Sequence, residues 1–198
     1  MMKHIFAAST IAASIVYAGT SQASIFINFD AVTSYANVDN FYDGGTDSAG
    51  ASGPNLGVDF VGWTTASGFG ATSQPNLAYN SADPATIDVA AGFSAGLAFT
   101  QGLYVPGHVG VYAGLDGTGS LLGSLDLPAS DPNAFAPVSL RFSGVAESVV
   151  FTGPVGNLGI DDLALGAPEP STWAMMALGF AGLGFAGARA RRSAVAAL

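Results

Sequence analysis

Phe93-Ser94-Ala95-Gly96-Leu97-Ala98-Phe99 and Val138-Ser139-Leu140-Arg141-Phe142 are the stretches that decide the fold of this chain. In the first, apolar side chains stand at every second position. In the second, three apolar side chains alternate with Ser139 and Arg141. A period of two residues is typical of a β-strand with one buried face, whereas a helix would repeat every three to four residues. Both stretches are therefore predicted to be strands.

Further short runs rich in β-branched and aromatic residues are bounded by Gly, Asp, Asn or Pro. They cover residues 24–29, 58–63, 108–112, 121–127, 149–151 and 160–165. The chain thus offers about nine candidate strands and no convincing amphipathic helix between its two ends. Short strands with frequent turns predict an all-β fold, an antiparallel β-sandwich or jelly roll.

Two of these runs also predict which way side chains point. Leu121, Leu125 and Leu127 are expected to share one face, and Asp161 is expected to point inward with Leu163. An inward carboxylate needs a cation or backbone donors as its partner. The segment between residues 30 and 56 is rich in Gly, Asp, Asn and Ser, so it is expected to be a long loop, functional or mobile.

The charge of the chain restricts its partners. The 198 residues carry a net charge of −9 and no cysteine. Between residues 24 and 167, Arg141 is the only Lys or Arg, against twelve aspartates and Glu147. Such a surface repels phosphate backbones, which argues against a nucleic-acid partner, and it attracts divalent cations. Without cysteines, the fold cannot depend on disulfides.

Residues 1–23 are predicted to be a signal peptide. Lys3 and His4 provide a short basic start, an apolar segment follows, and Ser21-Gln22-Ala23 is a small-x-small cleavage site that puts the cut between Ala23 and Ser24. An N-terminal anchor helix is the alternative, but the apolar segment is short for a membrane span.

The C-terminal region is predicted to contain a transmembrane helix. Every residue from Trp173 to Ala188 is apolar or glycine. As a helix this run would be roughly 24 Å long, a short but sufficient span once Ser171 and Thr172 are added. A basic stop-transfer cluster follows it, formed by Arg189, Arg191 and Arg192. Arginines mark the cytoplasmic side, so the preceding body would lie outside the cytoplasm. A buried core helix is the alternative interpretation of the run.

Pro168-Glu169-Pro170 directly before this run makes the region resemble the PEP-CTERM protein-sorting signal. The resemblance implies that Pro168, Glu169 and Pro170 form the motif recognised by a membrane-embedded transpeptidase, the exosortase. It also divides the chain into a signal peptide (1–23), a body (24–167), a sorting signal (168–192) and a tail (193–198). Residues 193–198 are a departure, since many members end sooner after the arginines.

The body also resembles exported PEP-CTERM proteins of unknown activity, through residues 38–45, 111–112, 116–119 and 160–163. Such bodies look like carbohydrate-binding or galactose-binding-like sandwiches, although a fold alone does not define a function. The family setting implies a Gram-negative envelope with an exopolysaccharide matrix. It also implies that the protein is held at the membrane, transiently or permanently, or secreted.

No arrangement of residues typical of an enzyme stands out. His108 is the only histidine after the signal peptide, Glu147 is the only glutamate of the body, and Gly-x-Ser-x-Gly and His-Glu-x-x-His are absent. The body is therefore predicted not to be catalytic. A carbohydrate-active enzyme of unrecognised type is the alternative, and a cleft with two carboxylates of raised pKa would favour it.

Two kinds of binding site remain as hypotheses. Ca²⁺ prefers several oxygen ligands, and Asp30, Asp43 and Asp161 could supply them if the first and last strands are adjacent; otherwise these aspartates cap turns. Sugars bind aromatic platforms, for which Tyr42 and Tyr104 are the preferred surface candidates because they lie beside glycine- or proline-rich turns. The aromatic residues available for that role are Tyr35, Phe41, Tyr42, Trp63, Tyr79, Tyr104 and Tyr112. The expected function is that of a structural or adhesive envelope or matrix protein with a carbohydrate-binding face.

Overall fold

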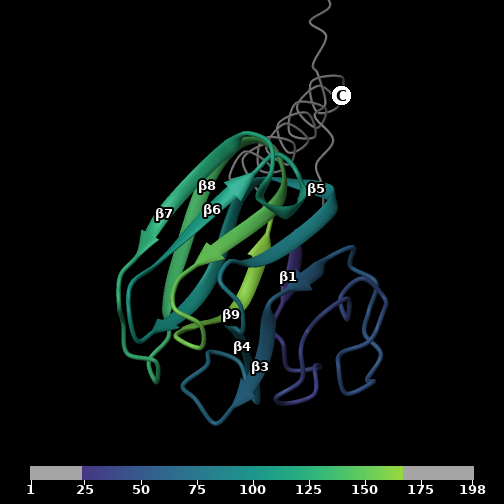
Figure 1. The fold of residues 1–198 in the computed structure, drawn as a ribbon, viewed down its shortest axis with the longest axis vertical. Helices are drawn as coiled ribbons and strands as arrows, with labels where there is room; N and C mark the ends of the chain where they lie inside the picture. The colour runs from purple at the N-terminus through teal and green to yellow at the C-terminus, as the bar shows by residue number, and fades with distance from the viewer. Residues whose placement is uncertain (1–23, 167–198) are drawn as a thin grey trace, which may run out of the picture.

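The structure is a computed structural model that describes residues 24–166 (Figure 1). The predicted signal peptide, with its cleavage site after Ala23, and the sorting signal, with its apolar run and arginines, lie outside the described residues. Within the described part of the chain, no helix is long and apolar enough to span a membrane.

Nine β-strands and one short 3-10 turn make up the domain, which confirms the predicted all-β sandwich. The strands, all paired antiparallel, are β1 (Ile25–Ile27), β2 (Asp59–Val61), β3 (Trp63–Ser67), β4 (Asn76–Asn80), β5 (Ala85–Leu103), β6 (Gly107–Tyr112), β7 (Leu121–Leu127), β8 (Ala136–Thr152) and β9 (Leu158–Leu165). The 3-10 turn η1 (Leu115–Gly117) joins β6 to β7.

The long strands β5 and β8 belong to both layers of the sandwich. The first part of β5 pairs with β2 and with the end of β8, which in turn pairs with β6. The second part of β5 pairs with β9 and with the start of β8. The pairing of β5 with β8 shifts register between Asp88 and Phe93, where Gly92 has a φ of 74°. A bulge with glycine at positive φ bends a strand, which turns one continuous sheet into two facing layers.

Strands β1 and β9 are adjacent, as the calcium hypothesis required. Ile25 pairs with Leu165, so the two ends of the described domain lie side by side (Figure 1). Strand β9 also pairs with β4 and with β5, which places it at the centre of the layer β3-β4-β9-β5. The site described below is built on the outer face of this layer.

The core between the layers confirms the predicted alternation. Phe93, Leu97 and Phe99 are buried, whereas Ala95 lies at a register shift of β5 and has a φ of 75°. The indole of Trp63 packs edge-on against the ring of Phe151, with centroids 5.1 Å apart. Its Nε1–H donates to a backbone carbonyl oxygen at 3.1 Å, so burying this side chain leaves no polar group unpaired.

Strand β7 differs from the prediction. Leu125 and Leu127 lie two residues apart and share one face, although Leu127 is buried and Leu125 is exposed. Leu121 lies beyond a register shift and pairs with Tyr112, so the expectation that all three leucines share a face is wrong. The pairing of β6 with β7 shifts by one residue between Val111 and Tyr112. Strand β7 lies at the edge of the sheet. An irregular edge strand does not have to keep its apolar residues inside.

The segment 30–56 is a loop, as predicted, and a buried carboxylate organises it. Asp47 is only 3% exposed, and it accepts hydrogen bonds from the backbone N–H groups of Thr33 (2.8 Å), Ala49 (2.9 Å) and Ala51 (2.9 Å). The loop also contributes rings to the core: Tyr42 packs against Phe41 at a centroid distance of 5.0 Å. Side-chain and backbone contacts therefore attach this loop to the core.

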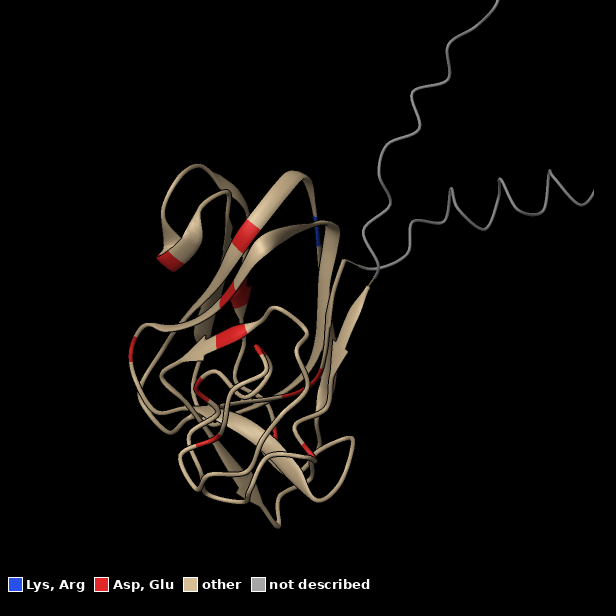
Figure 2. Cartoon of the chain, turned by 90° about the vertical axis from the view of Figure 1, so that its right-hand side faces the viewer, with Lys and Arg blue, Asp and Glu red and all other residues tan. Residues whose placement is uncertain are grey.

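Positions of Asp and Glu are spread over the ribbon of the domain, whereas a single basic segment is visible in Figure 2. Arg141 is the only Lys or Arg among residues 24–166. The domain therefore presents a predominantly negative surface.

Candidate functional site

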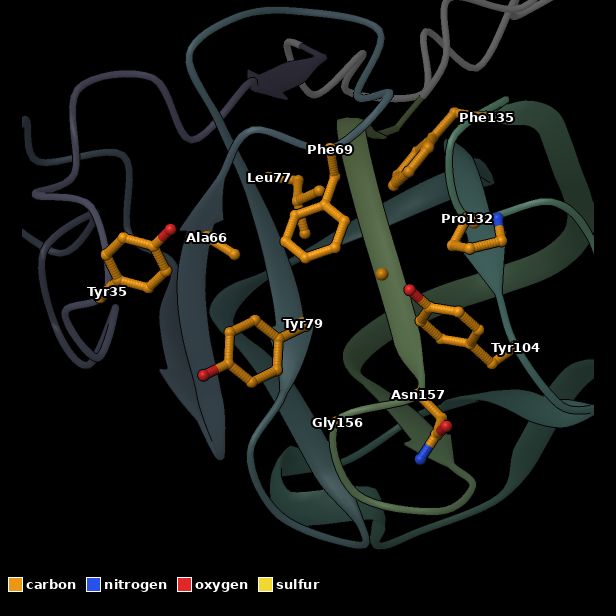
Figure 3. Close-up of a pocket in the computed structure, with 12 residues that line it drawn as sticks. Tyr35, Ala66, Phe69, Leu77, Tyr79, Tyr104, Pro132, Phe135, Gly156 and Asn157 are labelled. Carbon is orange, nitrogen blue, oxygen red and sulfur yellow. The ribbon is translucent and has the colours of Figure 1, made fainter.

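A pocket of about 220 Å³ lies on the outer face of the layer β3-β4-β9-β5. Five aromatic side chains line it, and we call it the aromatic pocket: Tyr35, Phe69, Tyr79, Tyr104 and Phe135 (Figure 3). Between them, the backbone of two paired glycines forms the floor. Gly102 of β5 is opposite Gly159 of β9, which in turn is opposite Tyr79 of β4. Residues opposite one another in antiparallel strands point to the same face of the sheet. On this face Tyr79 therefore contributes a ring, whereas Gly159 and Gly102 leave the backbone uncovered.

The glycine floor is required by close packing. A Cβ atom on Gly102 would lie 2.5 Å from the ring of Phe135, and one on Gly159 would lie 3.2 Å from the same ring. Any side chain at these positions would displace Phe135 or fill the pocket. Glycines inside strands often mark a close approach of this kind.

Two loops form the walls above the floor. The β3–β4 loop, residues 68–75, is held to β5 by the Thr72 hydroxyl, which donates to Thr100 Oγ1 at 2.8 Å. The β7–β8 loop, residues 128–135, is held to β5 by Ser130, whose Oγ accepts a hydrogen bond from the Leu103 N–H at 3.0 Å. A Cβ atom on Gly70 of the first loop would collide with the backbone of the second loop at Asn133. The two loops therefore touch and close one side of the aromatic pocket.

The tyrosines are the groups best placed to contact a ligand. Tyr104 is 55% exposed, Tyr35 is 67% exposed, and Tyr79 is half-buried. Figure 3 shows Tyr79 and Tyr104 on opposite sides of β9, with Asn157 below them. Within residues 24–166, the hydroxyls of Tyr79 and Tyr104 have no hydrogen-bond partner, so both can donate to or accept from a ligand.

The polar groups of the aromatic pocket are neutral. They are the tyrosine hydroxyls and the side-chain amide of Asn157, which donates to the Val155 carbonyl oxygen at 2.9 Å. None of the residues that line the pocket carries a charge. The site therefore combines apolar ring faces with uncharged hydrogen-bonding groups, and it lacks a partner for a charged ligand.

The two tyrosines predicted to bind sugars have different environments. Tyr104 lines the aromatic pocket, and its role in binding stays a prediction. Tyr42 is only 4% exposed and packs between core rings, and burial raises the pKa of its hydroxyl. Its assignment as a surface residue was wrong, because the glycine-rich turn beside it folds back over the core. Tyr35 and Tyr79 were candidates from the sequence, whereas Phe69, Phe135 and the glycine floor were missed.

Asp161 is placed differently from the prediction. It is fully buried, but it pairs with Thr100 on the face that carries Gly102 and Gly159, and not on the face of Leu163. The following residue, Asp162, has a φ of 49° at a register shift, and this bulge reverses the alternation.

Backbone donors are the partners of this carboxylate. It accepts hydrogen bonds from the N–H groups of Ser73 (2.7 Å) and Asp162 (2.8 Å) and from the Ser73 hydroxyl (3.1 Å). Burial raises the pKa of Asp161 to about 6, although these hydrogen bonds act to lower it.

The aspartates predicted as calcium ligands do not form a ligand set. Asp30 accepts a hydrogen bond from the Asn76 N–H at 3.0 Å, whereas Asp43 is exposed in the long loop. No group of three carboxylates or histidines that could hold a metal ion occurs between residues 24 and 166. Calcium binding stays a prediction, and residues 24–166 offer no site for it.

The residues considered for catalysis are not in the aromatic pocket. His108 Nδ1 lies 2.8 Å from Asp126 Oδ1, in a surface pair between β6 and β7. Glu147 lies on β8, away from the pocket lining.

Several solved structures are similar to the domain at a low level. A carbohydrate-binding module, CBM6cm-2, from Cellvibrio mixtus lichenase 5A in complex with cellotriose has a TM-score of 0.43 and 8% identity, covering 56% of this chain and 91% of that chain. A mutant of the family 29 carbohydrate-binding module CBM29-2 has a TM-score of 0.42 and 15% identity, and the match covers 72% of this chain and 92% of that chain. A glycoside hydrolase family 43 arabinoxylan arabinofuranohydrolase from Bacillus subtilis has a TM-score of 0.40 and 16% identity, covering 61% and 30%. Structural similarity at this level does not identify a ligand or an activity.

The sequence itself has one specific match. No curated protein matches the chain. The PEP-CTERM protein-sorting motif matches residues 167–192, which confirms the resemblance of this region to that sorting signal. The roles of individual residues in sorting remain predictions. In sequence, a PEP-CTERM protein-sorting motif follows the β-sandwich domain. This motif indicates that the protein is exported and sorted to the cell envelope.

Proposed function

We propose that this protein is a non-catalytic envelope or matrix protein that binds carbohydrate through the aromatic pocket. The observation that carries the proposal is the pair Tyr79 and Tyr104, which flank a bare glycine floor with free hydroxyls. An adhesive or structural role at the cell surface agrees with the sorting motif.

The chemistry of the aromatic pocket suits a sugar ring. A pyranose has C–H groups on its faces and hydroxyls around its edge. The C–H faces can lie against aromatic rings, which carry a negative π-face and a large apolar area. The hydroxyls can bond to Tyr79, Tyr104 and Asn157, while the glycine floor allows the ring to approach the backbone. An apolar pocket with a few placed polar groups is the usual form of a small-molecule site.

The sorting motif supports export and processing by an exosortase. In this proposal, residues 1–23 direct export and are removed after Ala23, and residues 173–188 hold the protein in the membrane until the tail is processed. The three arginines would keep the end of the chain in the cytoplasm. The body would then contact exopolysaccharide outside the cell.

Substitution of the two tyrosines tests the binding site. Tyr104→Ala and Tyr79→Ala should each weaken binding to soluble polysaccharides in affinity gel electrophoresis by about tenfold or more, because each removes a ring and a hydroxyl. Phe26→Ala is the matched control, since Phe26 is a 59% exposed aromatic side chain on β1, outside the pocket. Equal binding by the Tyr104→Ala and Phe26→Ala variants would contradict the assignment of this pocket.

No observation favours the enzyme alternative. Glycoside hydrolysis usually needs two carboxylates beside the scissile bond, and the residues lining the aromatic pocket include none. Release of new reducing ends from polysaccharides incubated with the protein would nevertheless restore that alternative.

A further inference from the structure

We infer that the aromatic pocket selects uncharged sugars, and that it takes one or two sugar residues at the end of a glycan or on a side branch. This inference rests on the proposed function and adds the class of ligand. It would exclude uronate, sulfated or other anionic glycans from the site.

The lining of the aromatic pocket offers no cation to an anionic sugar. A carboxylate or sulfate that leaves water requires Arg, Lys or several convergent N–H donors. No charged residue lines the aromatic pocket, and Arg141, the only Lys or Arg among residues 24–166, lies outside the lining. An anionic sugar would therefore lose hydration in the pocket without gaining an ion pair.

The charge around the aromatic pocket is also negative. Asp131 lies in the wall loop next to Pro132, and it is exposed, with Oδ1 accepting the Asn133 N–H at 2.8 Å. Thirteen acidic residues and one basic residue lie between residues 24 and 166. Their summed field repels anions from the surface before they reach the site.

The aromatic pocket is small and closed on one side. The volume of about 220 Å³ is below the roughly 300–1,000 Å³ of pockets that enclose drug-sized ligands. The loops that meet at Gly70 and Asn133 close one side, so a long polymer cannot lie across the pocket in that direction. The remaining opening suits a chain end or a short branch.

Matched pairs of neutral and anionic sugars test the charge selection. Calorimetric titration of the full-length protein in detergent would compare glucose, galactose and mannose, and disaccharides that end in them, with the corresponding uronic acids. The expected result is about tenfold or more weaker binding to the anionic member of a pair, with binding to the neutral member lost in Tyr104→Ala. Arg141→Gln should leave the selection unchanged, because Arg141 does not line the pocket.

A gain of function provides the second variant. Asn157→Arg places a cation in the pocket lining and should raise affinity for the anionic members about tenfold or more, with an unchanged melting temperature as the folding control. Titration of a neutral oligosaccharide series should show affinity that stops rising after the second sugar.

The outcomes separate the inference from the proposed function. Binding to both members of a pair that is lost in Tyr104→Ala would overturn the charge selection and keep the carbohydrate site. Binding that Tyr104→Ala leaves intact, or no binding to any of these sugars, would overturn both. Affinity that continues to rise beyond two sugars would overturn the proposed size of the ligand.

Discussion

Replacement of Asp47 by alanine should destabilise the domain strongly. Asp47 accepts three backbone hydrogen bonds, from Thr33, Ala49 and Ala51, at 2.8 to 2.9 Å. The residue is buried, and the loop that it holds carries core side chains such as Phe41 and Tyr42. The variant would leave three N–H donors without their acceptor and loosen the loop over the core.

The expected loss in the free energy of unfolding can be worked out from these three hydrogen bonds. A hydrogen bond to a charged group contributes about 1.5–3 kcal/mol net, and one between neutral groups contributes about 0.5–1.5 kcal/mol. Water can reach part of a surface loop after the substitution, so about 1 kcal/mol for each of the three bonds is appropriate. The expected loss in the free energy of unfolding is therefore about 3 kcal/mol, or roughly 10 °C in melting temperature for a domain of this size.

Urea denaturation followed by tryptophan fluorescence would measure this loss, because Trp63 is buried in the core. Asp43→Ala is the matched control. Asp43 is an exposed aspartate of the same loop whose side chain makes no hydrogen bond within residues 24–166, so its loss should change stability by less than about 0.5 kcal/mol. Equal stabilities of the Asp47→Ala and Asp43→Ala variants would refute the role of Asp47.

The pH dependence provides an independent check on the same variant. Burial raises the pKa of Asp47, but the hydrogen bonds from Thr33, Ala51 and Ala49 outweigh it and hold the pKa below the ordinary 3.8. The stabilisation is thus present above the pKa of the unfolded chain and is lost as pH falls through the lower pKa of the folded protein. The difference in the free energy of unfolding between wild type and Asp47→Ala should therefore become smaller in that acidic range. A difference that stays constant down to the lowest accessible pH would mean that the carboxylate charge is unimportant.

Three further predictions concern the pH profile, the pocket floor and sorting. The folded-state pKa of Asp161, raised to about 6, means that its contribution to stability falls as pH rises from about 4 to about 6, and Asp161→Asn should flatten this slope in thermal melts. Gly102→Ala should displace Phe135, cost about 1–3 kcal/mol in urea denaturation and weaken sugar binding, whereas Gly123→Ala, whose added Cβ would meet only ordinary contacts, should do neither. Exchange of the basic cluster for glutamine should impair membrane retention in fractionation assays, and unchanged fractionation would count against a stop-transfer role. The cluster consists of Arg189, Arg191 and Arg192.

The alternation of apolar residues was a sound basis for the fold class. It identified the segments around Phe93–Phe99 and Val138–Phe142, because a half-buried strand needs this pattern wherever it lies in the sandwich. It did not identify β4 or most of β3. Asn and Thr residues in these strands are buried by partners distant in sequence: Asn76 donates to the Val32 carbonyl oxygen at 2.8 Å, 44 positions away.

The site was only partly accessible from the sequence. Tyr104 was found because it lies beside a turn, and the same argument failed for Tyr42, whose turn folds over the core. The glycines at 102 and 159 carried a local signal, since glycine inside a strand indicates a close approach. That signal could not say which ring approaches, because Phe135 arrives from a separate loop.

The sequence by itself determined the all-β class, the acidic surface and the sorting motif, because these depend on side-chain period, charge count and a contiguous motif. Tertiary structure alone decided where the long strands bend, which way Asp161 points and which aromatic rings surround the glycine floor. A bulge of one residue reverses the faces of a strand, and strand pairing joins residues far apart in the chain. These features depend on which distant strands and loops pack together, and a local sequence pattern does not contain that information.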